Sequence, residues 1–115
     1  MITRIKAGPR MSQAVVHGNT VYLAGQVASS SSADVAGQTR EILATIDGLL
    51  AEAGTDKKRL LAATIYLADM STFNEMNAVW DAWVAPGCAP ARATVGAPLA
   101  SSAYRVEIVV TAARD

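Results

Sequence analysis

Two charged residues near the carboxyl end of the chain have types and surroundings that suit ligand binding. Arg92 follows the proline-bounded loop 86–90, and Glu107 lies inside the apolar run 104–112. A guanidinium at the mouth of a loop can hold a carboxylate through two parallel hydrogen bonds. A carboxylate among Val and Ile side chains is costly to bury unless something pairs with it or uses it. Together the two residues suggest a small site for an anionic molecule.

Each of these residues also has an ordinary structural interpretation. Most arginines are surface cations, so Arg92 by itself is most simply a solvated charge. Glu107 could pair across strands with an arginine such as Arg105 of a neighbouring chain. Arg92 and Glu107 are 15 positions apart in the sequence. If the two strands that carry them pair, both side chains could reach one end of the same cleft.

The composition indicates one domain, residues 1–115, that buries part of its surface against other chains. Of the 115 residues, 51% are hydrophobic and 17% are charged. This is little polar surface for a small domain, in which surface is large relative to volume. We therefore expect apolar surface to be covered by other copies of the chain.

Charge and residue counts argue against several classes of function. Ten basic and ten acidic residues cancel, and Lys57, Lys58 and Arg59 form the longest basic run, which argues against nucleic-acid binding. Cys88 is the only cysteine and His17, in a turn-like sequence, the only histidine. An internal disulfide and a cysteine-based metal cage are therefore excluded. No glycine-rich phosphate loop is present either, and we expect no metal and no cofactor.

The ends and the apolar runs of the chain predict a soluble cytoplasmic protein. Residues 1–6 lack the apolar stretch of a signal peptide. The longest largely apolar run, residues 60–68, is far too short to span a bilayer.

The hydrophobic periodicity predicts strands and helices in alternation. A hairpin is expected around residues 17–19, with a further edge strand at 2–7, and the serine run 29–32 indicates a flexible loop or the entry to a helix. The remaining predicted elements are a helix over 34–53, a strand over 60–68, a helix from Asp69 or Ser71 to about 84, and strands over 92–97 and 104–113. On the second helix Asn77 lies on the apolar stripe, where a buried amide needs partners, most simply in a neighbouring loop.

This order of elements predicts an α+β fold with a single mixed sheet. Two β-α-β crossovers after a hairpin place both helices on one face of the sheet. In the last strand, Arg105, Glu107, Val109 and Thr111 should share the face that the helices do not cover. That face is half apolar and half charged, which fits contact with a partner subunit better than contact with water.

Four segments resemble the RidA/YjgF family, the reactive intermediate deaminases that carry the older label endoribonuclease L-PSP. They are residues 90–95 (Pro-Ala-Arg-Ala-Thr-Val), 104–108 (Tyr-Arg-Val-Glu-Ile), 24–26 (Ala-Gly-Gln) and 73–77 (Phe-Asn-Glu-Met-Asn). The resemblance extends over essentially the whole chain, in order and without large gaps.

The resemblance implies a chorismate-mutase-like homotrimer in which three sheets form a central barrel with the helices outside. Its sites lie between subunits. The family arginine, here Arg92, binds the carboxylate of a small imine or enamine acid. The family glutamate, here Glu107, positions or activates the water that hydrolyses the C=N bond to a 2-oxo acid and ammonia. Asn77 and Gly25 match positions that line the cleft.

Three substrate-contacting positions differ from the best-known members of the family. Met11 stands where many members carry a tyrosine, Ala24 where serine or threonine is common, and Thr94 where cysteine is frequent. The resemblance therefore implies a sister subgroup with an altered substrate range. Two other functions stay open: a non-catalytic trimer that binds small carboxylates, and an endoribonuclease. The neutral charge, the single histidine and the lack of metal ligands disfavour the endoribonuclease.

Overall fold

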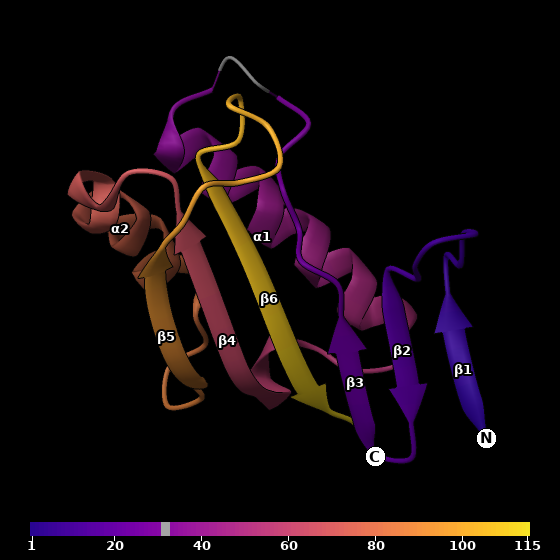
Figure 1. Cartoon of the computed structure of the whole chain (residues 1–115). Coiled ribbons are helices and arrows are strands. Elements are labelled where there is room, and N and C mark those ends of the chain that lie inside the picture. Colours follow the sequence, from indigo (N-terminus) through magenta and orange to yellow (C-terminus); the bar gives the residue numbers. More distant parts are fainter. Residues whose placement is uncertain (31–32) are drawn as a thin grey trace.

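The computed structural model describes residues 1–30 and 33–115 and shows one sheet with two helices (Figure 1). In chain order the elements are β1 (Ile2–Ile5), β2 (Ala14–His17), β3 (Thr20–Leu23), α1 (Val35–Glu52), the 3-10 turn η1 (Lys57–Arg59), β4 (Leu60–Leu67), the 3-10 turn η2 (Met70–Thr72), α2 (Phe73–Trp83), β5 (Ala91–Gly96) and β6 (Val106–Ala113). All the predicted strands and helices are present. The predicted loop or helix entry at 29–32 lies partly outside the described residues.

The six strands form one mixed sheet in the order β1-β2-β3-β6-β4-β5. Among these strands of residues 1–30 and 33–115, β4 and β5 pair in parallel and every other neighbouring pair is antiparallel. Strands β3 and β4 are both antiparallel to β6, so they run in the same direction on either side of it. The two predicted crossovers, through α1 and through α2, are therefore confirmed, and β1 and β5 form the two edges of the sheet (Figure 1).

Local signals in the sequence explain where α1 begins and ends. The Asp34 side chain caps the helix by accepting a hydrogen bond from the Gly37 N–H at 2.8 Å. Gly54 follows the helix at a φ of 85°, a left-handed conformation that glycine adopts without a steric cost. Between these ends, apolar residues recur on one face, and Ile42, Ile46 and Leu50 are fully buried.

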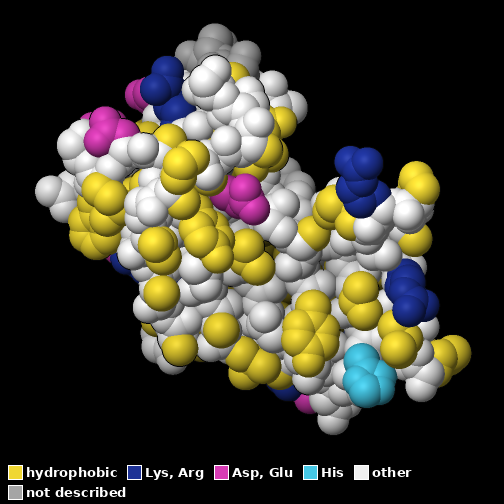
Figure 2. Space-filling view, in the orientation of Figure 1, with side chains coloured by type: hydrophobic (Ala, Val, Ile, Leu, Met, Phe, Trp, Pro, Cys, Tyr) yellow, Lys and Arg dark blue, Asp and Glu magenta, His cyan; other side chains and the backbone are white. Residues whose placement is uncertain are grey.

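The core lies between the helices and one face of the sheet. Strand β6 alternates strictly, with Val106, Ile108 and Val110 buried on the helix side and the intervening residues only half-buried. In the described part of the chain no helix covers the opposite face, and hydrophobic side chains are scattered across it (Figure 2). Tyr22 and Val95 on this face are 50% and 44% exposed. No helix in the described part of the chain is long and apolar enough to cross a membrane.

Candidate functional site

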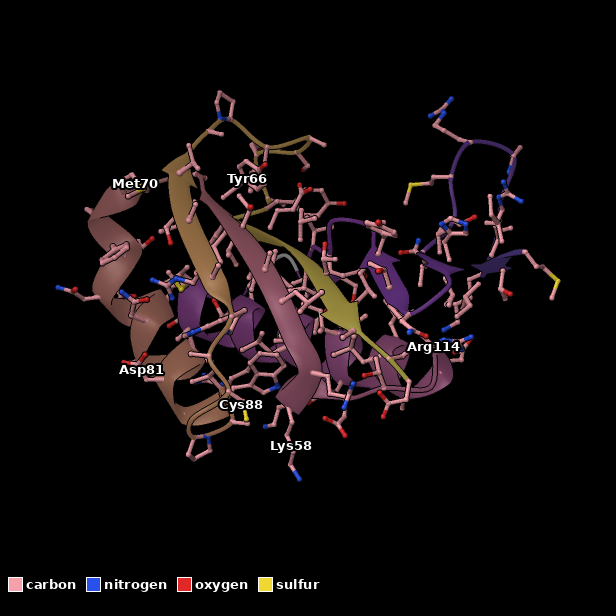
Figure 3. All side chains as sticks on the ribbon, turned by 90° about the horizontal axis from the view of Figure 1, so that it is seen from below. Lys58, Tyr66, Met70, Asp81, Cys88 and Arg114 are labelled. Atoms are coloured by element: carbon pink, nitrogen blue, oxygen red, sulfur yellow. The ribbon has the colours of Figure 1, made fainter. Side chains whose placement is uncertain are left out.

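Glu107 lies on the uncovered face of the sheet, as the alternation of β6 predicts. It pairs with Tyr66 of β4, so the two side chains project from the same face. Together with Val109 and residues 97–100 they line a pocket of about 310 Å³. Figure 3 shows Tyr66 on the side of the sheet away from the helices, beside the segment that follows β5. The Glu107 carboxylate makes no ion pair within the described residues.

The Glu107 carboxylate lies directly against the backbone of Gly25, in space that a side chain at position 25 would fill. A Cβ built on Gly25 would overlap Oε2 of Glu107 and come within 3.0 Å of its Cδ. The neighbouring residue fixes this approach, because Gln26 and Ile108 exchange two backbone hydrogen bonds of 2.9 and 3.1 Å. The side chain of Gln26 also donates to the Ala24 carbonyl at 3.0 Å. The segment 24–26 therefore forms one wall beside Glu107, and a glycine at position 25 is a steric requirement of that wall.

A buried amide holds the segment that leads into β6. Gln38 of α1 is fully buried. It donates to the Ala103 carbonyl at 3.0 Å and accepts from the Arg105 N–H at 2.9 Å. Sequence reasoning missed this residue, although its signal was available: Gln38 stands between Val35 and Ile42 on the apolar stripe of the helix, where an amide must find partners.

Arg92 lies on the other face of the sheet, against α2. It pairs with Ala63 of β4, which is buried on the helix side. Its guanidinium carbon lies 5.4 Å from the centre of the Trp80 ring. Within the described residues Arg92 makes no ion pair. A half-buried cation without a counter-charge is a strong candidate for anion binding.

Two polar atoms beside Arg92 are buried without partners in the described part of the chain. They are Oγ1 of Thr94, two residues along β5, and Oδ1 of Asn77, one helical turn before Trp80. The interpretation of Asn77 as an amide satisfied by a neighbouring loop is therefore not supported. Buried polar atoms are normally hydrogen-bonded. Their position marks the space between β5 and α2 as unusually polar.

The predicted site residues thus form two separate groups in one chain. The arginine half-site consists of Arg92, Thr94 and Asn77, at the β5 edge and on the helix side of the sheet. The glutamate half-site consists of Glu107, Gly25 and Ala24, on the uncovered face. One chain could bring Arg92 and Glu107 into one cleft only if β5 paired with β6. The two strands do not pair, because β4 lies between them.

Met11 and Arg105 lie apart from both half-sites. Met11 is in the loop after β1, at the edge of the sheet opposite β5, and is 48% exposed (Figure 1). Nε of Arg105 donates to the Ala33 carbonyl at 3.1 Å, which directs this side chain toward the start of α1. Arg105 therefore does not pair with Glu107 of its own chain.

A larger pocket, of about 650 Å³, lies between α1 and α2 and is lined by neither Arg92 nor Glu107. Two of its charged residues, Asp47 and Lys57, are already hydrogen-bonded to Trp83. The Trp83 N–H donates to the Asp47 carboxylate at 3.0 Å, and the Lys57 ammonium donates to the Trp83 carbonyl at 2.6 Å. The described residues contain no group of three His, Cys, Asp or Glu side chains that could hold a metal ion.

Comparison with known proteins places this geometry in one family. The family model described as Endoribonuclease L-PSP matches residues 1–114. A RutC family protein of Haemophilus ducreyi is 49% identical over 113 residues, which cover 98% of this chain and 97% of that protein. The chain belongs to the RidA/YjgF family. The RutC family protein YoaB of Escherichia coli K12 is another member, 47% identical over 112 residues and covering 97% of each chain.

A solved structure from the RidA/YjgF family has the same fold. NMB1025 of Neisseria meningitidis, a member of the YjgF protein family, superposes with a TM-score of 0.97 at 47% identity, covering 100% of this chain and 96% of that one. Family membership, predicted from residues 24–26, 73–77, 90–95 and 104–108, is therefore confirmed, as is the arrangement of one mixed sheet with two helices.

Proposed function

We propose that this protein is a deaminase that hydrolyses reactive enamine and imine intermediates, such as 2-aminoacrylate or 2-imino acids, to 2-oxo acids and ammonia. One observation supports it most directly. Arg92 and Glu107 both lack a counter-charge within the described residues, and each lines a half-site whose shape depends on specific neighbours. Two uncommitted charges of opposite sign suit a substrate that carries a carboxylate and reacts with water.

The two half-sites meet when an edge of one subunit lies over the uncovered face of the next. Arg92 is on the edge strand β5, where a neighbouring chain can approach it. Glu107 is on the face that has no helix over it and that carries the exposed Tyr22 and Val95. Repeating this contact around a threefold axis closes a ring, because a head-to-tail interface that closes gives a cyclic oligomer. With the three subunits that the family resemblance implies, we infer a homotrimer with one site at each subunit boundary.

The chemistry needs little beyond orientation and one carboxylate. The guanidinium of Arg92 binds the substrate carboxylate through two parallel N–H bonds and fixes the C=N carbon at the boundary. Glu107 of the adjoining subunit holds a water against that carbon and accepts its proton as the C–O bond forms. Glu107 returns that proton to the nitrogen of the resulting tetrahedral adduct. The hydroxyl proton of the adduct then also moves to the nitrogen as the C–N bond breaks, which releases ammonia and leaves a 2-oxo acid.

An imine generated in the cuvette tests this proposal. An amino-acid oxidase converts an L-amino acid to its 2-imino acid, and semicarbazide traps whatever imine has not been hydrolysed. The protein should lower the yield of semicarbazone and speed the release of ammonia. Arg92→Ala and Glu107→Gln should each abolish this effect. Equal rates with and without the wild-type protein would refute the proposal.

The same variants separate an enzyme from a binding protein. Thermal stabilisation by a 2-oxo acid without any turnover would favour a non-catalytic carboxylate-binding trimer. Loss of turnover with retained stabilisation in Glu107→Gln would favour the enzyme. RNA cleavage, the activity named in the family model, should be absent, because the net charge of zero provides no basic surface for the phosphate backbone.

A further inference from the structure

Trp80 lies directly against the arginine that binds the substrate in the proposed function. It is 4% exposed, although tryptophan is among the largest side chains. Its ring centre is 5.4 Å from the guanidinium carbon of Arg92, within the range of a cation–π contact. Tryptophan provides the strongest such contact among the aromatic residues.

The contact with Trp80 gives Arg92 no charged partner, so its N–H groups stay available to an anion. A ring stacked on a guanidinium uses the flat face of the cation, whereas carboxylates are bound in its plane, along the N–H edges. A carboxylate partner in the protein would have occupied those edges, and within the described residues Arg92 makes no ion pair. Trp80 can therefore fix the orientation of Arg92 without competing with a ligand.

Trp80 is itself held by a second tryptophan whose backbone and side chain are both anchored. The rings of Trp80 and Trp83 are 5.3 Å apart and inclined at 50°. The Trp83 N–H donates to Asp47 of α1, and Lys57 both donates to the Trp83 carbonyl and lies 5.2 Å from its ring centre. Contacts from two other parts of the chain thus fix the pair of rings that supports Arg92.

We propose that Trp80 is a positioning residue for Arg92, which it holds ready for a carboxylate, with Trp83 as its anchor. This inference rests on the proposed role of Arg92 in substrate binding. An arginine side chain loses considerable rotamer freedom when it is fixed. Stacking on Trp80 restricts that freedom before the ligand arrives, and the affinity for the carboxylate rises accordingly.

NMR of the arginine side chains tests the contact without reference to activity. The Cδ protons of Arg92, identified as the resonances missing in Arg92→Lys, should be shifted upfield by the Trp80 ring in the wild-type protein. Trp80→Phe should keep part of that shift, and Trp80→Leu should lose it. An unshifted Arg92 in the wild type, or a shift that persists in Trp80→Leu, would overturn the proposal. If Trp80→Leu does not fold, the wild-type and Trp80→Phe spectra still show whether the Trp80 ring lies against Arg92.

Kinetics in the imine assay provide the functional arm. Trp80→Leu should raise KM about tenfold, equivalent to about 1.4 kcal/mol, with kcat within about threefold, because binding rather than chemistry is impaired. Trp80→Phe should restore most of the affinity. A fall in kcat with unchanged KM would contradict a positioning role. If the wild type hydrolyses no imine, the proposed function fails, and the NMR shifts alone decide whether Trp80 orients Arg92.

Discussion

Gly25→Ala should lower activity strongly while leaving the fold intact. The added Cβ would overlap Oε2 of Glu107, lie 3.0 Å from its Cδ and lie 3.3 Å from its Cγ. Real Cβ atoms almost never approach another atom within 3.0 Å, so the carboxylate must move by about 1 Å or more. The atoms in the way are the end of a flexible side chain on a face that no helix covers, so they can move without disturbing the core.

We therefore expect a large loss of activity but only a small change in the free energy of unfolding. A misplacement of about 1 Å costs about a hundredfold in rate, so kcat/KM in the imine assay should fall by about that factor. The free energy of unfolding should change by less than about 1 kcal/mol, because alanine also reduces the entropy of the unfolded chain. Gly48→Ala is the matched control: nothing lies within 4 Å of a Cβ at this exposed helical position. It should keep full activity and stabilise α1 by about 0.5–1 kcal/mol.

A folded Gly25→Ala variant that keeps full activity would refute the steric reasoning.

Three further outcomes follow from other contacts. Gln38→Leu removes the buried amide that accepts the Arg105 N–H bond and should lower the free energy of unfolding by about 1–3 kcal/mol. An unchanged urea midpoint would show that Gln38 does not stabilise the fold. Ser29 donates hydrogen bonds from its N–H and its hydroxyl to the Glu41 carboxylate, which lowers the pKa of Glu41 below its usual 4.5. Ionised Glu41 therefore stabilises the fold fully at pH values above 4.5, and this stabilisation is lost as the pH falls through the lowered pKa. Glu41→Gln should therefore lower Tm at pH 7 but not in strong acid, and Tm curves that stay parallel across pH would contradict this. Tyr22→Glu should shift the oligomer toward monomer in sedimentation velocity. An unchanged sedimentation profile would mean that the sheet face around Tyr22 is exposed to solvent and is not a subunit interface.

Sequence patterns predicted the elements well because each carries its own periodicity. The helix over 34–53 has its cap at Asp34 and its stop at Gly54, and the strand over 60–68 is marked by β-forming residues. The alternation of β6 also placed Glu107 correctly on the uncovered face. These features depend on residues close in sequence, so the sequence reports them directly.

The strand order and the face of Arg92 were not predictable in the same way. Loop lengths do not reveal that β6 inserts between β3 and β4, so the pairing of β5 with β6 remained open. In β5 the alternation is misleading: Val95 faces away from the helices, and Arg92 and Thr94 face toward them. An apolar residue outside and a cation inside are opposite to the usual pattern of a strand on a hydrophobic core. The contact between Arg92 and Trp80 joins residues whose proximity depends on that arrangement.

Mixing two inactive variants tests most directly whether each site combines Arg92 of one subunit with Glu107 of the next. Arg92→Ala and Glu107→Ala should each be inactive alone. Co-refolded in equal amounts, they should recover about a quarter of the wild-type activity, because random assortment leaves both residues intact at about one boundary in four. If no activity returns although the mixed oligomers form, the two residues do not meet across a subunit boundary, and the proposed site is wrong.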